Sequence, residues 1–317
     1  MVSRGSPRAH AARARGSGPD GRPLTAFVLS GGGNQGVAQV GMLRGLVERG
    51  ILPDVVIGTS AGALNGACLC YAPNLTGVAR IANVWMGLDQ AGVFPGGKII
   101  RAWNVVRRGT HLFSNEGLDK LIDDATPARS FSDLRVPLRV IAADLDTGEE
   151  VVFARGPLKP ALLASACLPG VFPVVTHDGR RLVDGGVVNS VPLWHAISGP
   201  VDRVYVLNVS GSVTDRAQRS PLDVVMTSFL HSRNQRYELE RRHMPPGVEL
   251  IELPRPRDTR DIFDFSGGEA LIEEAYQLTI AALDAHDRAQ DGDHGTDHAP
   301  TRRRPHLPFR RARAIEA

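Results

Sequence analysis

The sequence predicts an α/β protein in which helices cover both faces of a mainly parallel central sheet, so that the fold has three layers. Short apolar segments of strand length alternate along the chain with stretches of helical spacing. Two windows without any charged side chain, Pro23–Leu43 and Val55–Ala79, each begin with such a segment and pass through glycines into a helical pattern. This is typical of buried parallel strands that lead directly into helices.

Six apolar segments bounded by turn residues predict the strands of the sheet. They are Ala26–Leu29, Val55–Ile57, Leu138–Ala142, Val151–Ala154, Val204–Val209 and Val248–Leu253. Apolar residues at helical spacing predict helices between these strands. Those helices are expected at Val37–Arg49, Ala63–Tyr71 and Leu158–Ala166.

Two later helices are predicted from their first residues. Ser220 followed by Pro221 places an N-cap residue before a proline in the first helical position. Ser266 and Glu269 have the spacing of a capping box, which predicts a helix over Ala270–Leu283. Strands that alternate with helices, without an internal repeat or linker, indicate one domain.

The segment Lys98–Arg108 has the pattern of a basic amphipathic helix. Its apolar residues Ile99, Ile100, Trp103 and Val106 recur at roughly helical spacing beside Arg101, Arg107 and Arg108. Such a helix either lies on an anionic lipid surface or packs as a cover on the body of the protein. Packing is the favoured interpretation, and transient contact with a membrane surface stays open.

Composition excludes several classes of protein. The chain of 317 residues is 42% hydrophobic, which excludes wholesale disorder, and its 3 Cys cannot form a disulfide framework. Aromatic residues make up only 5%, too few for the stacking platforms of single-strand nucleic-acid binders. Neither a signal peptide nor a membrane-spanning segment is evident. We therefore expect a cytoplasmic protein that is at most peripheral to a membrane, without a nucleic-acid partner and of unknown oligomeric state.

The net charge of +3 conceals two basic ends on an acidic body. Residues 1–22 contain five Arg and one Asp, and residues 301–317 contain six Arg and one Glu, so residues 23–300 carry 3 − 4 − 5 = −6. We expect residues 1–22 to be a disordered basic arm, 23–285 a single catalytic domain, and 286–317 a disordered tail rich in Arg and His. Because Arg is preferred to Lys along the whole chain, the Arg-rich ends do not indicate a nucleic-acid partner.

The pentapeptide Gly58-Thr59-Ser60-Ala61-Gly62 stands between a predicted strand and a predicted helix. A G-x-S-x-G sequence in this context is a nucleophile elbow, in which a strained turn exposes the serine oxygen. Gly58 and Gly62 would let the strand and the helix approach closely. The N-terminus of the helix would stabilise negative charge that develops at Ser60.

A second glycine-rich turn, Gly31 to Gly36, follows the first predicted strand. Consecutive glycines can direct several backbone N–H groups into one concavity that holds an oxyanion or a phosphate. Gly31, Gly33 and Gly36 also have G-x-G-x-x-G spacing, and Asp54 lies within range of a nucleotide-binding acid. With a G-x-S-x-G elbow downstream, we favour the oxyanion role, and a non-catalytic nucleotide- or lipid-binding protein remains the alternative.

The sequence offers two kinds of general base for Ser60. Asp184-Gly185-Gly186 follows the apolar pair Leu182-Val183, so an aspartate stands at a strand end. An α/β-hydrolase-type esterase would instead use a histidine. The histidines of the body are His111, His177, His195, His231, His243 and His286, and none lies in a distinctive turn.

The glycine loop, the elbow and the Asp-Gly-Gly turn, in this order, resemble the patatin-like phospholipase family. Ala164-Ser165-Ala166-Cys167-Leu168-Pro169-Gly170-Val171-Phe172-Pro173 resembles the A-S-x-x-x-P-x-x-F-P block of that family, and Asn189-Ser190-Val191-Pro192 also fits. The resemblance extends from about Ala26 to Leu207.

The resemblance implies a lipid acyl hydrolase of the phospholipase A, lysophospholipase or carboxylesterase type, with a Ser–Asp dyad and without metal or cofactor. Ser60 would attack the ester carbonyl, Asp184 would act as general base, and the N–H groups of Gly31, Gly32 and Gly33 would form the oxyanion hole. Gly36, Gly58, Gly62, Gly185 and Gly186 would support these motifs. One departure is Gln35, where the family usually has Arg or Lys, so a preference for phospholipid over neutral ester does not follow.

Overall fold

The structure is a computed structural model that describes residues 21–88, 113–210, 224, 228, 235–257 and 264–293. Contacts divide the chain into two compact units, residues 1–282 and 283–317, and the described part of the second is the end of one helix. The predicted helices at Lys98–Arg108 and from Pro221 lie wholly or mostly outside the described residues. Most of the predicted basic arm and tail lies outside them too.

Five parallel strands form the centre of the sheet. They are β1 (Thr25–Leu29), β2 (Val55–Thr59), β3 (Leu138–Asp144), β7 (Arg203–Leu207) and β8 (Glu249–Glu252). Three antiparallel strands complete it, β4 (Glu150–Phe153), β5 (Val175–His177) and β6 (Arg180–Asp184). The strand order is β5-β6-β3-β2-β1-β7-β8, and β4 pairs with β3. The prediction of a mainly parallel sheet is therefore confirmed.

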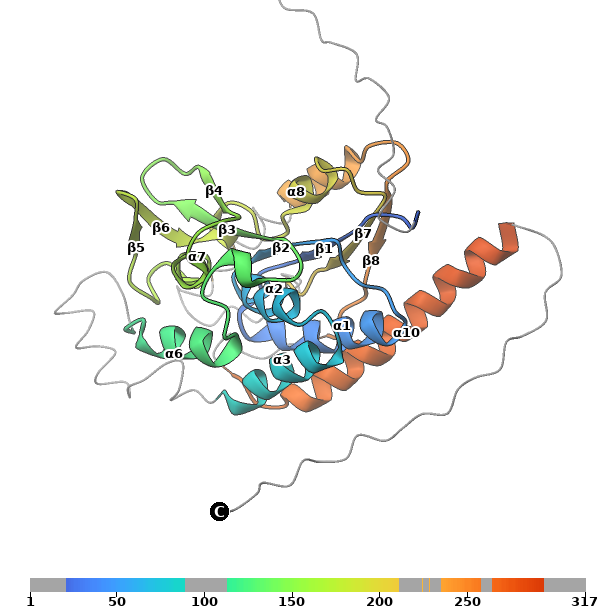
Figure 1. Cartoon of the computed structure of the whole chain (residues 1–317), viewed down its shortest axis with the longest axis horizontal. Helices are drawn as coiled ribbons and strands as arrows, with labels where there is room; N and C mark the ends of the chain where they lie inside the picture. The colour runs from blue at the N-terminus through green and yellow to red at the C-terminus, as the bar shows by residue number, and fades with distance from the viewer. Residues whose placement is uncertain are drawn as a thin grey trace, which may run out of the picture. The chain divides into compact units, whose positions relative to one another are not determined.

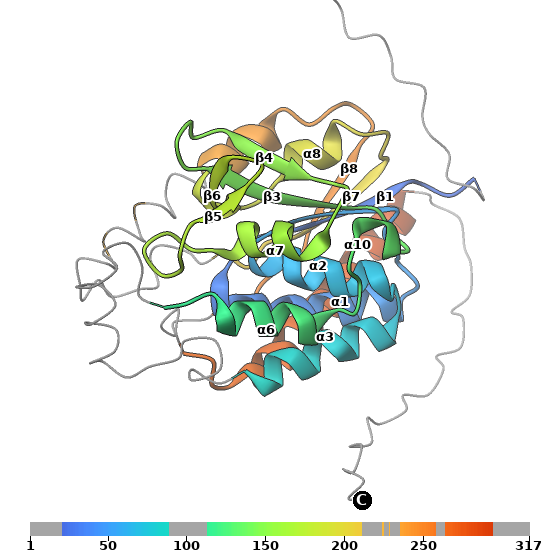
Figure 2. The same cartoon turned by 60° about the vertical axis from the view of Figure 1, so that its left-hand side comes forward.

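Helices lie on both faces of the sheet (Figure 1). On one face are α1 (Ala38–Glu48), α2 (Ala61–Tyr71), α3 (Leu75–Gly87), α6 (Glu116–Ala125), α7 (Leu158–Ala166) and the part of α10 (Gly268–Asp293) that belongs to the first unit. On the other face are α8 (Leu193–Ile197) and the helical residues 235–242, as Figure 2 shows. The three-layer prediction is confirmed, and α7 has the predicted bounds.

The two charge-free windows form the centre of the fold. Their strands become β1 and β2, where Ala26, Phe27, Val28 and Leu29 are completely buried. Their helical patterns become α1 and α2, and the glycine turn before α1 contains the 3-10 helix η1 (Gly33–Val37). Side chains of α8, together with Tyr237, cover the opposite face of β1, β2 and β7. Burial on both faces explains why these segments contain no charge.

Close packing of α1 on α10 depends on glycine. A Cβ placed at Gly41 would lie 2.0 Å from the carbonyl oxygen of Ile272, and one at Gly45 would lie 2.8 Å from Thr279 Cγ2. The predicted capping box at Ser266 does not form, because the Ser266 hydroxyl donates to Asp264 and the helix begins at Gly268. α10 also continues past residue 285, the predicted end of the catalytic domain, to Asp293.

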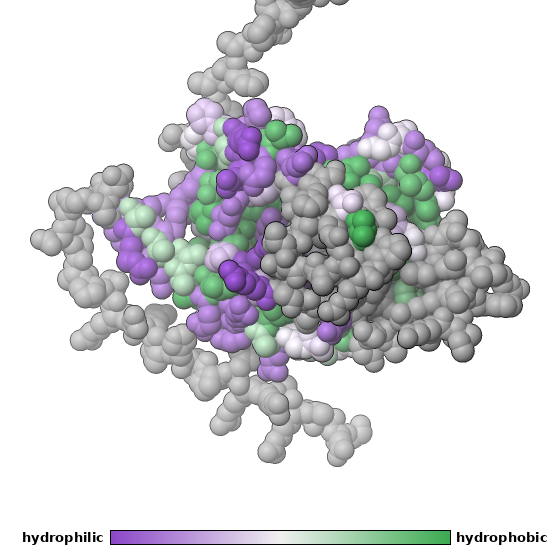
Figure 3. Space-filling view, turned by 180° about the vertical axis from the view of Figure 1, so that it is seen from behind, coloured by the Kyte–Doolittle hydropathy of each residue, from purple (hydrophilic) through white to green (hydrophobic). Residues whose placement is uncertain are grey.

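The described surface mixes hydrophilic and hydrophobic side chains (Figure 3). Large hydrophobic side chains that are exposed are scattered along the described chain: Leu52, Leu75, Met86, Leu145, Val152, Val174, Trp194, Val224 and Leu239. Among the described helices, none has both the length and the apolar character needed to cross a membrane.

Candidate active site

Ser60 occupies a sharp turn between β2 and α2. Its φ of 54° and ψ of −124° lie outside the regions that non-glycine residues usually adopt, as the predicted elbow requires. A Cβ at Gly58 would lie 2.6 Å from the carbonyl oxygen of Gly62, and one at Gly62 would lie 2.3 Å from that of Leu29. Both positions therefore admit only glycine without a backbone shift, in agreement with their predicted role.

The register of β3 brings Ser60 and Asp184 together. β4 pairs with one edge of β3 over Val140–Ala143, so β2 and β6 must both lie along the other edge. β2 ends with Thr59 opposite Ile141, and β6 ends with Asp184 opposite Ala142. The carboxyl ends of a parallel and an antiparallel strand thus meet at adjacent positions of β3.

Ser60 Oγ donates a hydrogen bond to Asp184 Oδ2 at 2.6 Å. The other carboxylate oxygen of Asp184 accepts from the N–H of Gly186 at 2.7 Å, and Asp184 N donates to the carbonyl of Cys167 at 3.0 Å. Asp184 is only 4% exposed. The close approach at Gly185, where a Cβ would lie 2.2 Å from Ile141 O, places this turn against β3.

The glycine loop contacts the elbow, but its three N–H groups are not equivalent. A Cβ at Gly31 would lie 3.3 Å from Ser60 Cβ. Gly31 N–H donates to Ser190 O at 2.9 Å, and Gly31 O accepts from Ser210 Oγ at 2.8 Å. Gly31 N–H is therefore already used in the fold, unlike the prediction that it serves an oxyanion.

Gly32 and Gly33 differ from Gly31 in exposure and in the use of their backbone N–H groups. Gly32 is half-buried and Gly33 is exposed with a φ of 59°. Within the described residues, neither N–H donates to a protein acceptor. Two adjacent N–H groups next to the elbow are thus available to a ligand.

A buried amide network fixes the loop from behind. Gln39 Nε2 donates to the carbonyls of Ser30 and Leu207, at 2.9 and 3.0 Å, where β1 and β7 end. Asn65 Nδ2 donates to Gly36 O and Gln39 Oε1, both at 2.9 Å. Trp85 Nε1 donates to Asn65 Oδ1 at 2.9 Å. Every side-chain amide group of Gln39 and Asn65 is thereby paired, and Gly36 is held at the start of α1.

Ser165 is a further residue of the site that the motifs did not predict, although it lies within the block Ala164–Pro173. Ser165 is completely buried at the end of α7. Its Oγ accepts from Ser60 N–H at 2.9 Å and donates to Ile141 O at 2.6 Å. The A-S-x-x-x-P block is the only signal in the sequence that points to it.

Gln35 lies beside the loop but is directed away from solvent. Its side chain is 5% exposed, and its Nε2 has no hydrogen-bond partner among the described residues. It lines a small cavity together with Val209 and Arg255.

The described histidines do not hydrogen-bond to Ser60. His195 Nε2 pairs with Glu150 Oε1 at 2.5 Å, His243 Nδ1 lies 2.7 Å from Leu239 O, and His177 lies 3.5 Å from Asp178. His286 belongs to the second compact unit. The other two candidates, His111 and His231, lie outside the described residues.

Asp54 lies at the wrong end of the sheet for the nucleotide alternative. Its carboxylate accepts from Thr25 N–H at 2.8 Å and pairs with Arg22, at the start of β1. The glycine loop follows the end of β1, about 15 Å away for a five-residue strand. The acid and the loop cannot hold the two parts of one nucleotide in the usual way.

All three cysteines lie in the interior of the fold. Cys68, Cys70 and Cys167 are free thiols with at most 2% exposure. Burial raises the pKa of Cys68 to about 12, despite the opposing charge of Arg80, and raises that of Cys167 to about 12 as well. All three thiols therefore pack as small side chains in the interior.

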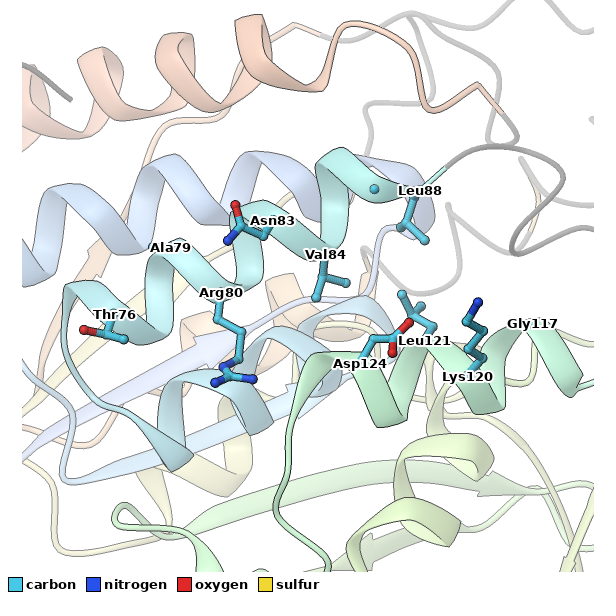
Figure 4. A pocket seen from close by; sticks show the side chains of 11 residues that line it. Thr76, Ala79, Arg80, Asn83, Val84, Leu88, Gly117, Lys120, Leu121 and Asp124 are labelled. Carbon is cyan, nitrogen blue, oxygen red and sulfur yellow. The ribbon is translucent and has the colours of Figure 1, made fainter. Parts of the chain in front are cut away.

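A cavity of about 630 Å³ lies between α3 and α6, separate from the residues described above (Figure 4). Its walls carry apolar side chains beside Arg80, Lys120 and Asp124, and Val84 and Leu121 extend toward one another across it. Neither Ser60 nor Asp184 lines it. The cavity is therefore not part of the candidate active site.

Comparisons with known proteins identify the family. A profile of the family described as patatin-like phospholipase matches residues 27–197, more than half of the chain. Neuropathy target esterase sws of Drosophila melanogaster is 33% identical over 173 residues, which span 52% of this chain and 11% of that protein. The chain thus matches about a tenth of the length of the curated relatives.

The fold also has a counterpart of known structure. VipD from Legionella pneumophila matches with a TM-score of 0.50 and 14% identity, over 86% of this chain and 70% of that one. This likeness concerns the fold alone. The family profile, which matches more than half of the chain, agrees with the order of the motifs and leads to one conclusion: the chain belongs to the patatin-like phospholipase family.

Proposed function

We propose that this protein hydrolyses carboxylic acyl esters of lipids through an acyl-enzyme on Ser60. The observation that carries the proposal is the hydrogen bond from Ser60 Oγ to Asp184 Oδ2, 2.6 Å long, at a strained turn. A nucleophile and a base within hydrogen-bond reach are the requirement for covalent ester hydrolysis. The family profile and the esterase named among the relatives favour lipid esters as the substrate class.

In the acylation step, Ser60 Oγ attacks the ester carbonyl carbon while its proton passes to Asp184. The carbonyl oxygen becomes an oxyanion that accepts from the N–H groups of Gly32 and Gly33. When the tetrahedral intermediate collapses, the bond to the alcohol oxygen breaks, and Asp184 returns the proton to that leaving group. The acyl group stays bound to Ser60 Oγ.

In the deacylation step, Asp184 takes a proton from a water molecule that attacks the acyl-enzyme carbonyl. The second tetrahedral oxyanion uses the same two N–H groups. Its collapse releases the carboxylic acid and returns the proton to Ser60. Loss of one oxyanion donor raises the activation barrier by about 2.7–4 kcal/mol in serine hydrolases. The two N–H groups should therefore account for a large part of the rate acceleration.

A fluorophosphonate probe and a hydrolysis panel test the proposal. The probe should attach to Ser60, and the panel should compare short p-nitrophenyl esters, phospholipids and lysophospholipids. Ser60→Ala should abolish both labelling and hydrolysis. Ser132→Ala, which removes an exposed serine hydroxyl elsewhere, should change neither. Hydrolysis that survives in Ser60→Ala would show that the proposed nucleophile is wrong.

A further inference from the structure

The Ser165 hydroxyl joins the nucleophile turn to the central strand. Its two hydrogen bonds have fixed directions, because an amide N–H can only donate and a carbonyl oxygen can only accept. Ser165 Oγ therefore accepts from Ser60 N–H at 2.9 Å and uses its single hydrogen to donate to Ile141 O at 2.6 Å. The side chain is completely buried, so water does not compete for either bond.

Ile141 marks the junction between the two strands that carry the dyad. It is the last residue of β3 in register with β2, and Ala142 is the first in register with β6. The carbonyl oxygen of Ile141 also lies against Gly185, where a Cβ would approach it to 2.2 Å. One carbonyl group thus contacts the Asp184 turn directly and the Ser60 turn through Ser165.

The backbone conformation of Ser60 explains what the two hydrogen bonds of Ser165 do. A φ of 54° is unfavourable for serine and persists only where surrounding contacts impose it. The bond from Ser60 N–H to Ser165 fixes the plane of the peptide group that precedes the nucleophile. That plane, with the backbone angles of Ser60, sets the direction in which the Ser60 side chain leaves the turn.

We infer that Ser165 is a positioning residue, which holds Ser60 Oγ in line with Asp184 by anchoring the Ser60 amide to the Ile141 carbonyl. Ser165 touches neither reacting atom, and it acts through the backbone of the nucleophile. The inference rests on the proposed function of Ser60. It predicts that loss of the Ser165 hydroxyl lowers the rate at which Ser60 reacts in every molecule. Substrate binding should stay unchanged.

The test compares Ser165→Ala with the wild type and with Thr126→Val. Thr126 is a matched control, since its hydroxyl is buried and accepts a backbone N–H, from Ala128 at 3.2 Å, away from the dyad. Fluorophosphonate labelling gives both the rate constant and the final fraction of chains labelled. Steady-state hydrolysis of a p-nitrophenyl ester gives kcat and KM separately.

For Ser165→Ala we expect labelling to reach the wild-type fraction with a rate constant lower by about ten- to a hundredfold, because small misplacements of a reacting group cost up to that factor. The value of kcat should fall in parallel, and KM should change by less than about twofold. Thr126→Val should keep the wild-type rate constant. Ser165→Cys, which keeps a donor and an acceptor at the γ position but forms weaker hydrogen bonds, should lie between Ser165→Ala and the wild type.

Three results would overturn the inference. They are an unchanged labelling rate constant in Ser165→Ala, a smaller labelled fraction with an unchanged rate constant, and an equal loss in Thr126→Val. If Ser165→Ala does not fold, the same criteria apply to Ser165→Cys. Wild-type protein that neither labels at Ser60 nor hydrolyses esters would instead refute the proposed function, so the two failures are distinguishable.

Discussion

Both carboxylate oxygens of Asp184, the base in the proposed mechanism, take part in hydrogen bonds. Gly186 N–H fixes Oδ1, and this leaves Oδ2 directed at Ser60 Oγ. A carboxylate needs no third residue to orient it when the backbone does so, whereas a histidine base requires a partner to fix its tautomer. The turn Asp184-Gly185-Gly186 therefore contains both the proposed base and the backbone N–H group that orients it.

Asp184→Asn tests the role of this carboxylate at constant size. The amide can still accept from Gly186 N–H, but it cannot take the proton of Ser60. We expect kcat for ester hydrolysis to fall by about 10²–10⁴-fold, the usual contribution of a general base. The fold should be retained, which far-UV circular dichroism checks.

Asp144→Asn is the matched control for this substitution. Asp144 is also buried, and its Oδ1 accepts from the N–H groups of Asp146 and Thr147 rather than from Ser60. Its kcat should stay within about twofold of wild type. A similar loss of kcat in both variants would mean that a buried carboxylate matters for folding rather than for proton transfer.

At the scale of the elements, α2 begins directly against the ends of β1 and β2. A Cβ at Gly62 would meet backbone atoms, Leu29 O at 2.3 Å and Ser30 O at 2.6 Å. One turn later, a Cβ at Gly66 would meet only side-chain atoms of Val56 and Leu138, at 3.1 and 3.2 Å. The backbone of Leu29 and Ser30 cannot move aside without moving the glycine loop that follows it, whereas the side chains of Val56 and Leu138 can adjust.

Gly62→Ala should therefore damage both stability and the site. We expect the free energy of unfolding to fall by about 1–3 kcal/mol, the usual cost of overpacking, and Ser60 labelling to slow because α2 must shift. For Gly66→Ala, the higher helix propensity of alanine, about 1 kcal/mol, offsets the tighter contact. Urea unfolding and fluorophosphonate labelling measure the two effects. Equal losses of unfolding free energy in the two variants would contradict the interpretation that backbone contacts restrict position 62 more than side-chain contacts restrict position 66.

Local sequence was sufficient for the elements that build the site, because their signals lie within a few residues. Strand, glycines and helix are contiguous in both charge-free windows, so β1, β2, α1 and α2 were predictable. α3 was missed although Asn74 caps it, with an Oδ1 that accepts from Thr76 and Gly77 N–H, and although Val78, Ile81 and Trp85 line one face. β5 has three residues and is defined only by its pairing with β6.

Contacts between distant segments could not be predicted from the sequence. The use of Gly31 N–H by Ser190 and the bridge from Ser165 to Ser60 each join residues more than a hundred positions apart. Their residue types are ordinary for buried turns, and no spacing in the sequence specifies such a pair. The same holds for the register that places Asp184 one position beyond Thr59 along β3.

At the scale of the whole molecule, one partly buried carboxylate connects the elements on the face opposite α2. Glu150, at the start of β4, accepts from His195 of α8 at 2.5 Å and from Arg236 at 2.6 Å. Asn189 Nδ2 donates to the same carboxylate at 3.2 Å, and Asn189 O accepts from Thr59 Oγ1 at 2.9 Å, next to the nucleophile. Glu150 thus joins four segments behind the dyad.

The charge on Glu150 should make stability depend on pH. Burial opposes the charge, but the hydrogen bond and charge of His195, together with Arg236, outweigh burial and hold the pKa of Glu150 below its ordinary value of 4.5. A lowered pKa in the folded state stabilises the fold fully above the unfolded pKa. This contribution is lost as the pH falls through the folded value.

Glu150→Gln should therefore lower the free energy of unfolding by about 1.5–3 kcal/mol near neutral pH, the usual range for hydrogen bonds to a charged group. The deficit relative to wild type should shrink as the pH falls from about 4.5 through the lower folded pKa, because the carboxylate is protonated first in the unfolded chain and then in the folded protein. Urea unfolding across this range measures the difference. The adjacent, exposed Glu149→Gln provides the control and should show little loss at any pH. A deficit for Glu150→Gln that stays constant with pH would show that the charge of Glu150 does not stabilise the fold, and that only its shape and packing do.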